Sequence, residues 1–230
     1  MPEFKRIGIL GGISHFTTIE YYSRILNLYK SRYNDINYPE IVIYSLSHGP
    51  FKVLEDNNRM DDYVDYISQG IKGLINSGAE IIALAANSPH RVMNELKNRF
   101  DIPIISAVDS AYLEAQRLKI KNGLLLGIKF TMQSSFYQDR FKKGGIEIIT
   151  PDNHEQEQIN DIIFNKFDGQ TIDQRSIDTI LGIISGYPVD GVILGCMRLP
   201  VFFNEQTVGG LNLVNTLNKH IEEILNQAKN

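Results

Sequence analysis

The chain has 230 residues, of which 43% are hydrophobic and 22% are charged, and its formal net charge is −4 at pH 7. This composition is typical of a globular protein, and the length allows one large domain or two small ones. The lack of a basic stripe argues against nucleic acid as a partner, and no apolar run approaches the roughly 18 residues that a membrane span needs. Lys5 and Arg6 precede only a short apolar run that ends in two glycines, so we expect a first strand and turn there and no signal peptide.

The sequence contains one cysteine, Cys196, which excludes an internal disulfide and a cysteine-rich metal site. The histidines outside the motifs described below are not spaced as metal ligands are; they are His15, His48, His154 and His220. We therefore expect no metal site and no cofactor, and a reducing, cytoplasmic location.

Short apolar runs alternate with longer segments of helical period along the chain. The predicted strands are residues 6–10, 40–45, 81–85, 104–106, 123–126, 146–149 and 191–194. The predicted helices are residues 17–30, 60–77, 91–99, 107–118, 131–142, 155–167, 172–185 and 213–228. Strands that alternate with helices indicate right-handed βαβ units and parallel sheets.

The pattern runs twice, because each half has an early strand and a later strand that stops at a small polar residue, Asn87 or Cys196. This repetition predicts two similar α/β lobes around an interlobe cleft. We expect residues 1–106 plus 213–230 to form the N-terminal lobe and residues 107–212 to form the C-terminal lobe. Ligands of such sheets bind outside the carboxyl ends of the strands, so Asn87 and Cys196 are expected to line the same cleft.

The segment from Gly11 to Ser14 follows the first strand and precedes a helix. Its glycines allow a tight turn and a close approach to an anion at the helix start. A dinucleotide site would need a third glycine, which is absent, and a plain strand-to-helix turn remains open. Thr17 or Thr18 is the expected helix cap.

Two further motifs follow buried strands. Asn87 and Ser88 offer a donor and an acceptor to a carboxylate, although an Asx turn into a helix with Pro89 at its first position fits equally. Cys196 is either a nucleophile or base activated by a helix N-terminus, or an inert buried thiol. Thr131 follows another strand and is expected to cap a helix.

Together and in order, these motifs resemble the cofactor-independent aspartate/glutamate racemase family over roughly residues 5–224. The motifs that carry the resemblance are Ile9 to Ser14 with Thr18, Tyr21 and Tyr22, then Asn87 to His90, Leu126-Gly127 with Thr131-Met132, Ile159-Asn160 with Ile162 to Phe164, and Gly195-Cys196. The resemblance implies two α/β lobes, usually in a homodimer, and a reaction without pyridoxal phosphate or metal. In the family one cysteine removes the α-proton as thiolate, and a second delivers a proton to the opposite face as thiol.

Carried over by residue, the resemblance makes Cys196 the second thiol, while Ala86 stands where the first thiol would be. Asn87 and Ser88 match the pair that holds the α-carboxylate. The remaining residues implied in substrate binding are Ile13, Ser14, Glu55, Thr131, Gln158, Met197 and Arg198. Among these positions, Gln158 replaces a lysine, Met197 a threonine and Arg198 an acid, and Ile128 replaces a threonine after Leu126-Gly127.

These exchanges leave three functions open. The first is a racemase or epimerase acting on a small amino or carboxylic acid, with altered or weakened activity because alanine transfers no proton. In that case water, His90 or another residue serves the empty face. The second is a one-thiol decarboxylation, as in the related arylmalonate decarboxylases, for which Ile128 and Met197 would favour an apolar substituent. The third is a non-catalytic protein that binds a small molecule.

Overall fold

The structure is a computed structural model, and it describes residues 4–166, 172–201, 203 and 207–229. The chain divides into two compact units: residues 1–106 with 220–230, here unit 1, and residues 107–219, here unit 2. The sequence placed the second boundary at residue 213. The structure places it after Lys219, because the last strand of unit 2 extends to Asn215 and leads directly into the C-terminal helix.

Unit 1 is built on a four-stranded parallel sheet with the order β2-β1-β3-β4. Its strands are β1 (Ile7–Gly11), β2 (Ile41–Ser45), β3 (Ile81–Leu84) and β4 (Ile104–Ile105). Its helices are α1 (His15–Tyr33), α2 (His48–Asp56), α3 (Met60–Asn76), the 3₁₀ helix η1 (Ser88–Val92), α4 (Met93–Arg99) and the part of α10 (Thr216–Ala228) from His220 onward.

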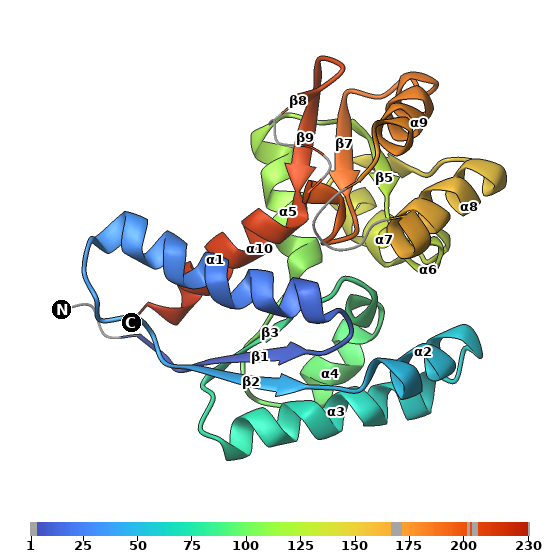
Figure 1. Ribbon diagram of the computed structural model, residues 1–230. Coiled ribbons are helices and arrows are strands. Elements are labelled where there is room, and N and C mark those ends of the chain that lie inside the picture. Colours follow the sequence, from blue (N-terminus) through green and yellow to red (C-terminus); the bar gives the residue numbers. More distant parts are fainter. Residues whose placement is uncertain (1–3, 167–171, 202, 204–206, 230) are drawn as a thin grey trace. The chain divides into compact units, whose positions relative to one another are not determined.

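The two faces of this sheet are covered by different helices, because alternate strand residues point to opposite sides. Leu10, Ile82 and Leu84 pack in one cluster with α3 and α4. Ile7 and Ile9 are fully buried on the other face, where α1 lies (Figure 1). Burial on both faces explains why these strands are continuous apolar runs in the sequence.

Unit 2 contains a five-stranded sheet with the order β6-β5-β7-β9-β8. Its strands are β5 (Asn122–Leu126), β6 (Glu147–Ile149), β7 (Gly191–Leu194), β8 (Thr207–Val208) and β9 (Leu211–Asn215). Its helices are α5 (Ala107–Arg117), α6 (Lys129–Gln133), α7 (Phe136–Lys142), α8 (Asn153–Asp161), the π-helical turn η2 (Ile162–Lys166), α9 (Gln174–Ser185) and the 3₁₀ turn η3 (Leu199–Val201). The pairing is parallel except between β8 and β9.

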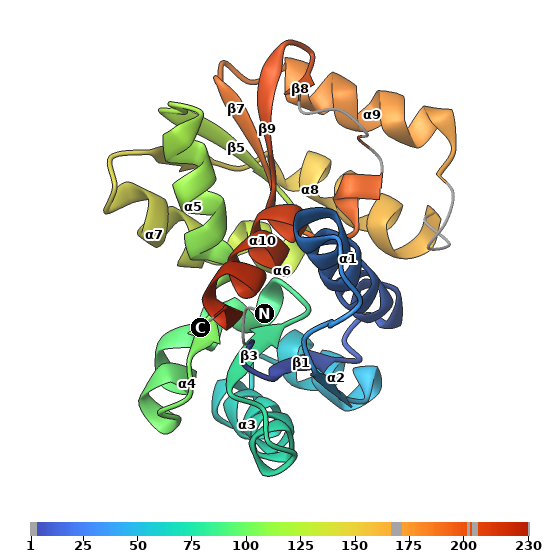
Figure 2. The same ribbon diagram turned by 90° about the vertical axis from the view of Figure 1, so that its left-hand side faces the viewer.

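The sheet of unit 2 also has two apolar faces. Leu124 and Leu126 pack in one cluster with α8 and α9, whereas Leu125 packs in a second cluster with α5 and α7. Figure 2 shows α5 and α7 on one side of β5, β7 and β9, and α8 and α9 on the other. Both units therefore have the three-layer α/β architecture that the alternating pattern predicted.

Several predicted elements differ from the observed ones. Residues 213–228 were predicted as one helix, but their first part belongs to β9, which pairs with β7, and β8 was not predicted. Residues 131–142 form two helices, α6 and α7, which are separated at Ser134 and Ser135. The predicted helix 155–167 begins earlier, at Asn153, and continues as the π turn η2; its last residue, Phe167, lies outside the described residues. Helix α2 had no clear period in the sequence and was not predicted as a separate element.

The C-terminal helix is fixed to unit 1 by a buried hydrogen-bonded histidine. His220 Nδ1 lies 2.6 Å from the Tyr21 hydroxyl, and its Nε2 lies 3.0 Å from the carbonyl oxygen of Ile105. Complete burial lowers the pKa of His220 to about 3, so the ring is neutral. A neutral ring that donates from Nε2 to a carbonyl must accept at Nδ1, so Tyr21 is the donor.

We expect Tyr21→Phe to lower the free energy of unfolding by about 1–3 kcal/mol, because it leaves the buried Nδ1 of His220 without a donor. Tyr38 of the same unit is exposed, so Tyr38→Phe is the matched control and should change stability by less than about 0.5 kcal/mol. Urea denaturation of both variants checks this, and equal stabilities would contradict the assigned role of Tyr21.

Candidate functional site

The loops that follow β1, β2 and β3 leave the sheet of unit 1 at the same edge. Gly11 is in register with Ser45, and Leu10 is in register with Leu84. Gly12 adopts a φ of +88°, and a Cβ atom at this position would lie 2.0 Å from the carbonyl oxygen of Leu46. Only glycine fits such an approach, so the glycine turn brings the start of α1 against the end of β2.

Ser14 caps α1, and its hydroxyl accepts a hydrogen bond from the Thr17 amide at 3.4 Å. The expectation that Thr17 or Thr18 is the cap was therefore wrong, because the helix begins two residues earlier. The Thr18 hydroxyl instead closes the turn: it accepts from the Gly12 amide at 3.0 Å and donates to the carbonyl of Ser14 at 2.9 Å. Ile13 is half-buried beside the apolar cluster that includes α3.

Asn87 and Ser88 are both buried at the end of β3, where Asn87 precedes the first residue of η1. Pro89 occupies the first turn, as expected, but the turn is 3₁₀ rather than α-helical. His90 is buried as well: its Nδ1 lies 3.2 Å from the carbonyl oxygen of Asn87, and its ring packs edge-on against His220. Ala86, directly before Asn87, is half-buried.

Glu55 lies on α2 and is connected to this strand end by hydroxyl groups. The Tyr63 hydroxyl donates to Glu55 Oε1 at 3.2 Å, and the Ser88 side chain also hydrogen-bonds to the carboxylate. Burial raises the pKa of Glu55, although the hydrogen bonds from Ser88 and Tyr63 lower it in part. The structure therefore brings together two residues that the sequence proposed separately, Glu55 and Ser88.

In unit 2, Cys196 follows the end of β7 after one residue, Gly195, and is only 9% exposed. Burial raises the pKa of its thiol, whereas hydrogen bonds from the backbone N–H groups of Arg198 and Leu199, together with the charge of Arg198, oppose that shift. The sulfur thus has donors ready for a thiolate but is held mainly as a thiol. A buried thiol of this kind suits delivery of a proton.

Buried hydroxyl groups lie close to Cys196. Thr216 donates a hydrogen bond to the carbonyl oxygen of Leu194, and Tyr137, which is completely buried, hydrogen-bonds to Thr216. Burial raises the pKa of Tyr137, so its hydroxyl remains protonated. No motif points to Tyr137 or Thr216, because both lie in segments predicted only as helix.

Thr131 is completely buried, and its methyl group packs against the backbone of Gly127 and Gly195. The expectation that it caps a helix was wrong, because α6 begins at Lys129 and the cap position is Ile128. Within the described part of the chain, the Thr131 hydroxyl has no hydrogen-bond partner. An unsatisfied buried hydroxyl costs about 1–3 kcal/mol, so it is a candidate contact for a ligand oxygen.

The other candidates of unit 2 lie on the same side of its sheet or beside Cys196. Ile128 is half-buried against the cluster that contains α8 and α9, and Gln158 is half-buried on α8 itself. Met197 is buried and Arg198 is half-buried. The Asn160 side chain on α8 accepts a hydrogen bond from the backbone N–H of Lys129 at 2.9 Å. This bond connects α8 to the start of α6, just after β5.

The described ranges contain neither a metal-binding cluster nor a membrane-spanning helix. None of those residues forms a group of three or more His, Cys, Asp or Glu side chains that could hold a metal ion. Among the helices in the same ranges, none has both the length and the apolar character required to cross a membrane.

The chain has two α/β units, and in each of them polar side chains follow the strands of a parallel sheet. A buried thiol also follows one of those strands. These features define an α/β protein suited to proton transfer. Residues 10–223 match the family described as Asp/Glu/hydantoin racemase. Over 160 residues the chain is 30% identical to the broad specificity amino-acid racemase RacX of Bacillus subtilis (strain 168), a match that covers 68% of this chain and 69% of RacX. The chain therefore belongs to the Asp/Glu/hydantoin racemase family.

Solved structures agree with this assignment. An aspartate racemase homologue from Pyrococcus horikoshii OT3 is 28% identical, with a TM-score of 0.84, and the match covers 97% of this chain and 99% of that one. A Yersinia pestis protein provisionally assigned as an Asp/Glu racemase is 27% identical, with a TM-score of 0.87 and the same coverage. The predicted family and the predicted α/β fold with two lobes containing parallel sheets are thus confirmed.

We expect the rate of Cys196 alkylation by iodoacetamide to rise with pH and to reach its midpoint at a higher pH than for a free cysteine, because burial raises the thiol pKa. Arg198→Gln should move the midpoint higher still, since it removes a charge that favours the thiolate. Arg175→Gln, at an exposed position of the same unit, is the control and should leave it unchanged. The chain has one cysteine, so mass spectrometry reads the reaction directly. A midpoint at or below that of a free cysteine in the same buffer would contradict this assignment.

Proposed function

We propose that this chain is a pyridoxal-phosphate-independent racemase or epimerase that acts at the α-carbon of a small amino or carboxylic acid in the cytoplasm. Membership of the racemase family supports the reaction class. The observation that carries the proposal is the environment of Cys196: a buried thiol just after a strand, with two backbone donors and Arg198 available to its thiolate form. Such a group can both deliver and remove a proton at carbon.

The α-carboxylate of the substrate needs polar partners, because charge develops on it as the α-proton leaves. We propose that Asn87 and Ser88 of unit 1, with Ile13 and Ser14 of the glycine turn beside them, and Thr131 of unit 2 contribute to that binding. The unsatisfied hydroxyl of Thr131 supports its inclusion, since a ligand oxygen would give it the partner that the described residues lack.

The residues proposed to surround the substrate side chain favour a neutral side chain over an acidic one. We propose that Ile128, Gln158, Met197 and Arg198 contact it. Two of these side chains are apolar, and a carboxylate beside them would lose hydration without gaining partners. Arg198 is the one cation of the four and can hold a carboxylate bidentately. We therefore propose neutral amino acids first, with acidic ones depending on Arg198.

The test is racemisation, together with α-proton exchange in heavy water, across a panel of L- and D-amino acids without added cofactor. We expect slow turnover on at least one substrate, and we expect Cys196→Ser to reduce it by about 10²- to 10⁴-fold, the usual contribution of a positioned acid–base group. Ala86→Cys should raise the rate, because it provides a thiol after β3. Binding without exchange or turnover on the whole panel would sink the proposal, and carbon dioxide release from a malonate would favour a decarboxylase.

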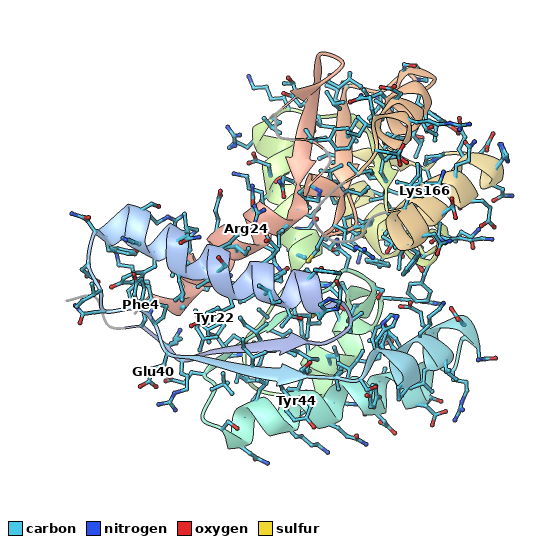
Figure 3. All side chains as sticks on the ribbon, in the orientation of Figure 1. Phe4, Tyr22, Arg24, Glu40, Tyr44 and Lys166 are labelled. Atoms are coloured by element: carbon cyan, nitrogen blue, oxygen red, sulfur yellow. The ribbon has the colours of Figure 1, made fainter. Side chains whose placement is uncertain are left out.

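We propose in addition that the protein is a homodimer that associates through unit 1. Large apolar side chains are exposed on α1, where Ile19 is 62% and Tyr22 is 45% exposed, and on the edge strand β2, where Ile43 is 42% and Tyr44 is 40% exposed. Figure 3 labels Tyr22 on α1 and Tyr44 on β2. Apolar groups gathered at a sheet edge are a liability in a monomer and favour association.

Light scattering after size exclusion should give the mass of a dimer for the unaltered chain. We expect the double variant Ile19→Lys with Ile43→Lys to be monomeric, because two charges would be buried without partners. Leu113→Lys, at an exposed apolar position on α5 in unit 2, is the matched control and should remain dimeric. A monomeric mass for the unaltered chain would refute the proposed dimer.

A further inference from the structure

Unit 1 contains a carboxylic acid, Glu55, to which the resemblance to the family assigns only a role in substrate binding. We infer that Glu55 is the acid–base residue of unit 1, and that it performs at the substrate α-carbon the proton transfer that Ala86 cannot perform. This inference rests on the proposed racemase function and names the residue that makes the reaction two-sided.

The position of Glu55 follows from the chain path. Helix α2 starts three residues after the last residue of β2, so it lies beyond the same sheet edge as the end of β3. The Glu55 side chain hydrogen-bonds to Ser88, which is two residues after Ala86. Two residues of extended chain span about 7 Å at most, so the serine that holds the carboxylate belongs to the same short segment as the position that lacks a thiol.

The partners of Glu55 leave its proton-transfer capacity intact. Its hydrogen-bond partners are the neutral hydroxyl groups of Tyr63 and Ser88, and the charges of Asp56 and Lys52 act on its pKa in opposite directions and less than burial does. The lysine one turn earlier on α2, Lys52, forms an ion pair with Asp56 at 2.8 Å. A carboxylate held by hydroxyls is oriented without the strong stabilisation of its charged form that an arginine or lysine would impose.

The electrostatic environment suits a base. Burial raises the pKa of Glu55 above the ordinary value of a carboxyl group, which strengthens it as a proton acceptor near neutral pH. Glutamate removes a proton next to a carbonyl group in triosephosphate isomerase, so the chemistry has a precedent. Burial also raises the pKa of Cys196, which favours the thiol form, so the group of unit 2 is suited to donate a proton and the carboxylate of unit 1 to accept one.

The alternative named from the sequence, His90, is less suitable. Its ring is buried, its Nδ1 contacts the carbonyl oxygen of Asn87, and its edge packs on His220. These contacts direct the ring towards the interior of unit 1 and make it a support of the Asn87 backbone. A role for Glu55 in holding the substrate ammonium group is the stronger competitor, and the experiment below separates the two.

The reaction balances without a redox partner. The Glu55 carboxylate takes the α-proton, and the electron pair of the C–H bond remains on the substrate as an enolate of its carboxylate. The Cys196 thiol then gives its proton to the opposite face of the α-carbon and becomes a thiolate. The protein regains its starting form by exchanging protons with water or by turning over the other enantiomer in the reverse direction.

The decisive experiment combines Glu55→Gln with Ala86→Cys. We expect Glu55→Gln to reduce kcat for racemisation by about 10²- to 10⁴-fold with little change in KM, since glutamine keeps the shape but transfers no proton. Adding Ala86→Cys to this variant should restore at least a tenth of the unaltered rate, because the thiol supplies the missing group. Asp61→Asn, at an exposed position at the start of α3, is the control and should retain full activity.

Exchange of the α-proton in heavy water gives a second, independent reading. Cys196→Ser should still exchange one enantiomer without inverting it, through Glu55, and Glu55→Gln should still exchange the other, through Cys196. Unchanged activity of Glu55→Gln would overturn the inference while leaving the racemase function intact. A raised KM that Ala86→Cys does not rescue would assign Glu55 to ammonium binding and overturn it equally. Lack of any exchange by the unaltered protein would instead refute the racemase function itself.

Discussion

The close approach of backbone segments at the carboxyl ends of parallel strands is the constraint on which the rest of unit 1 depends. Gly12 contacts the backbone of Leu46 at a distance that excludes any side chain, and this contact holds the start of α1 against the end of β2. The chain leaving β2 then forms α2, which carries Glu55 to the same edge as Ser88. Without this packing the carboxylate would be one more exposed glutamate.

Each unit places neutral hydrogen-bond donors around its proposed acid–base group. Glu55 is held by the hydroxyls of Tyr63 and Ser88, whereas Cys196 is held by two backbone N–H groups, with the Tyr137 and Thr216 hydroxyls behind it. Burial raises both pKa values, so neither group is locked in its charged form. A carboxylate and a thiol differ in acidity, however, and such a pair would favour one direction of proton flow more than two thiols would.

A layer of buried polar contacts supports these groups. His90 contacts the backbone of Asn87 and packs on His220, which in turn is held by Tyr21 and by the carbonyl of Ile105. The C-terminal helix thus contributes to the position of the loop after β3. In unit 2, Thr216 plays a comparable part, because it begins that helix and hydrogen-bonds to the last residue of β7. Satisfied buried networks of this kind make a local geometry unique.

The sequence alone reveals the α/β class, most strand positions, the glycine turn and the motifs of the racemase family, because these depend on local apolar runs and on residues adjacent in the chain. It did not determine β9, since a short strand followed at once by a helix reads as one amphipathic segment. It also could not connect Glu55 with Tyr63 and Ser88, or Tyr21 with His220, because these pairs are brought together by packing between segments that no local pattern links. Tertiary structure decided which polar groups share a buried environment, and burial is what sets their acidity.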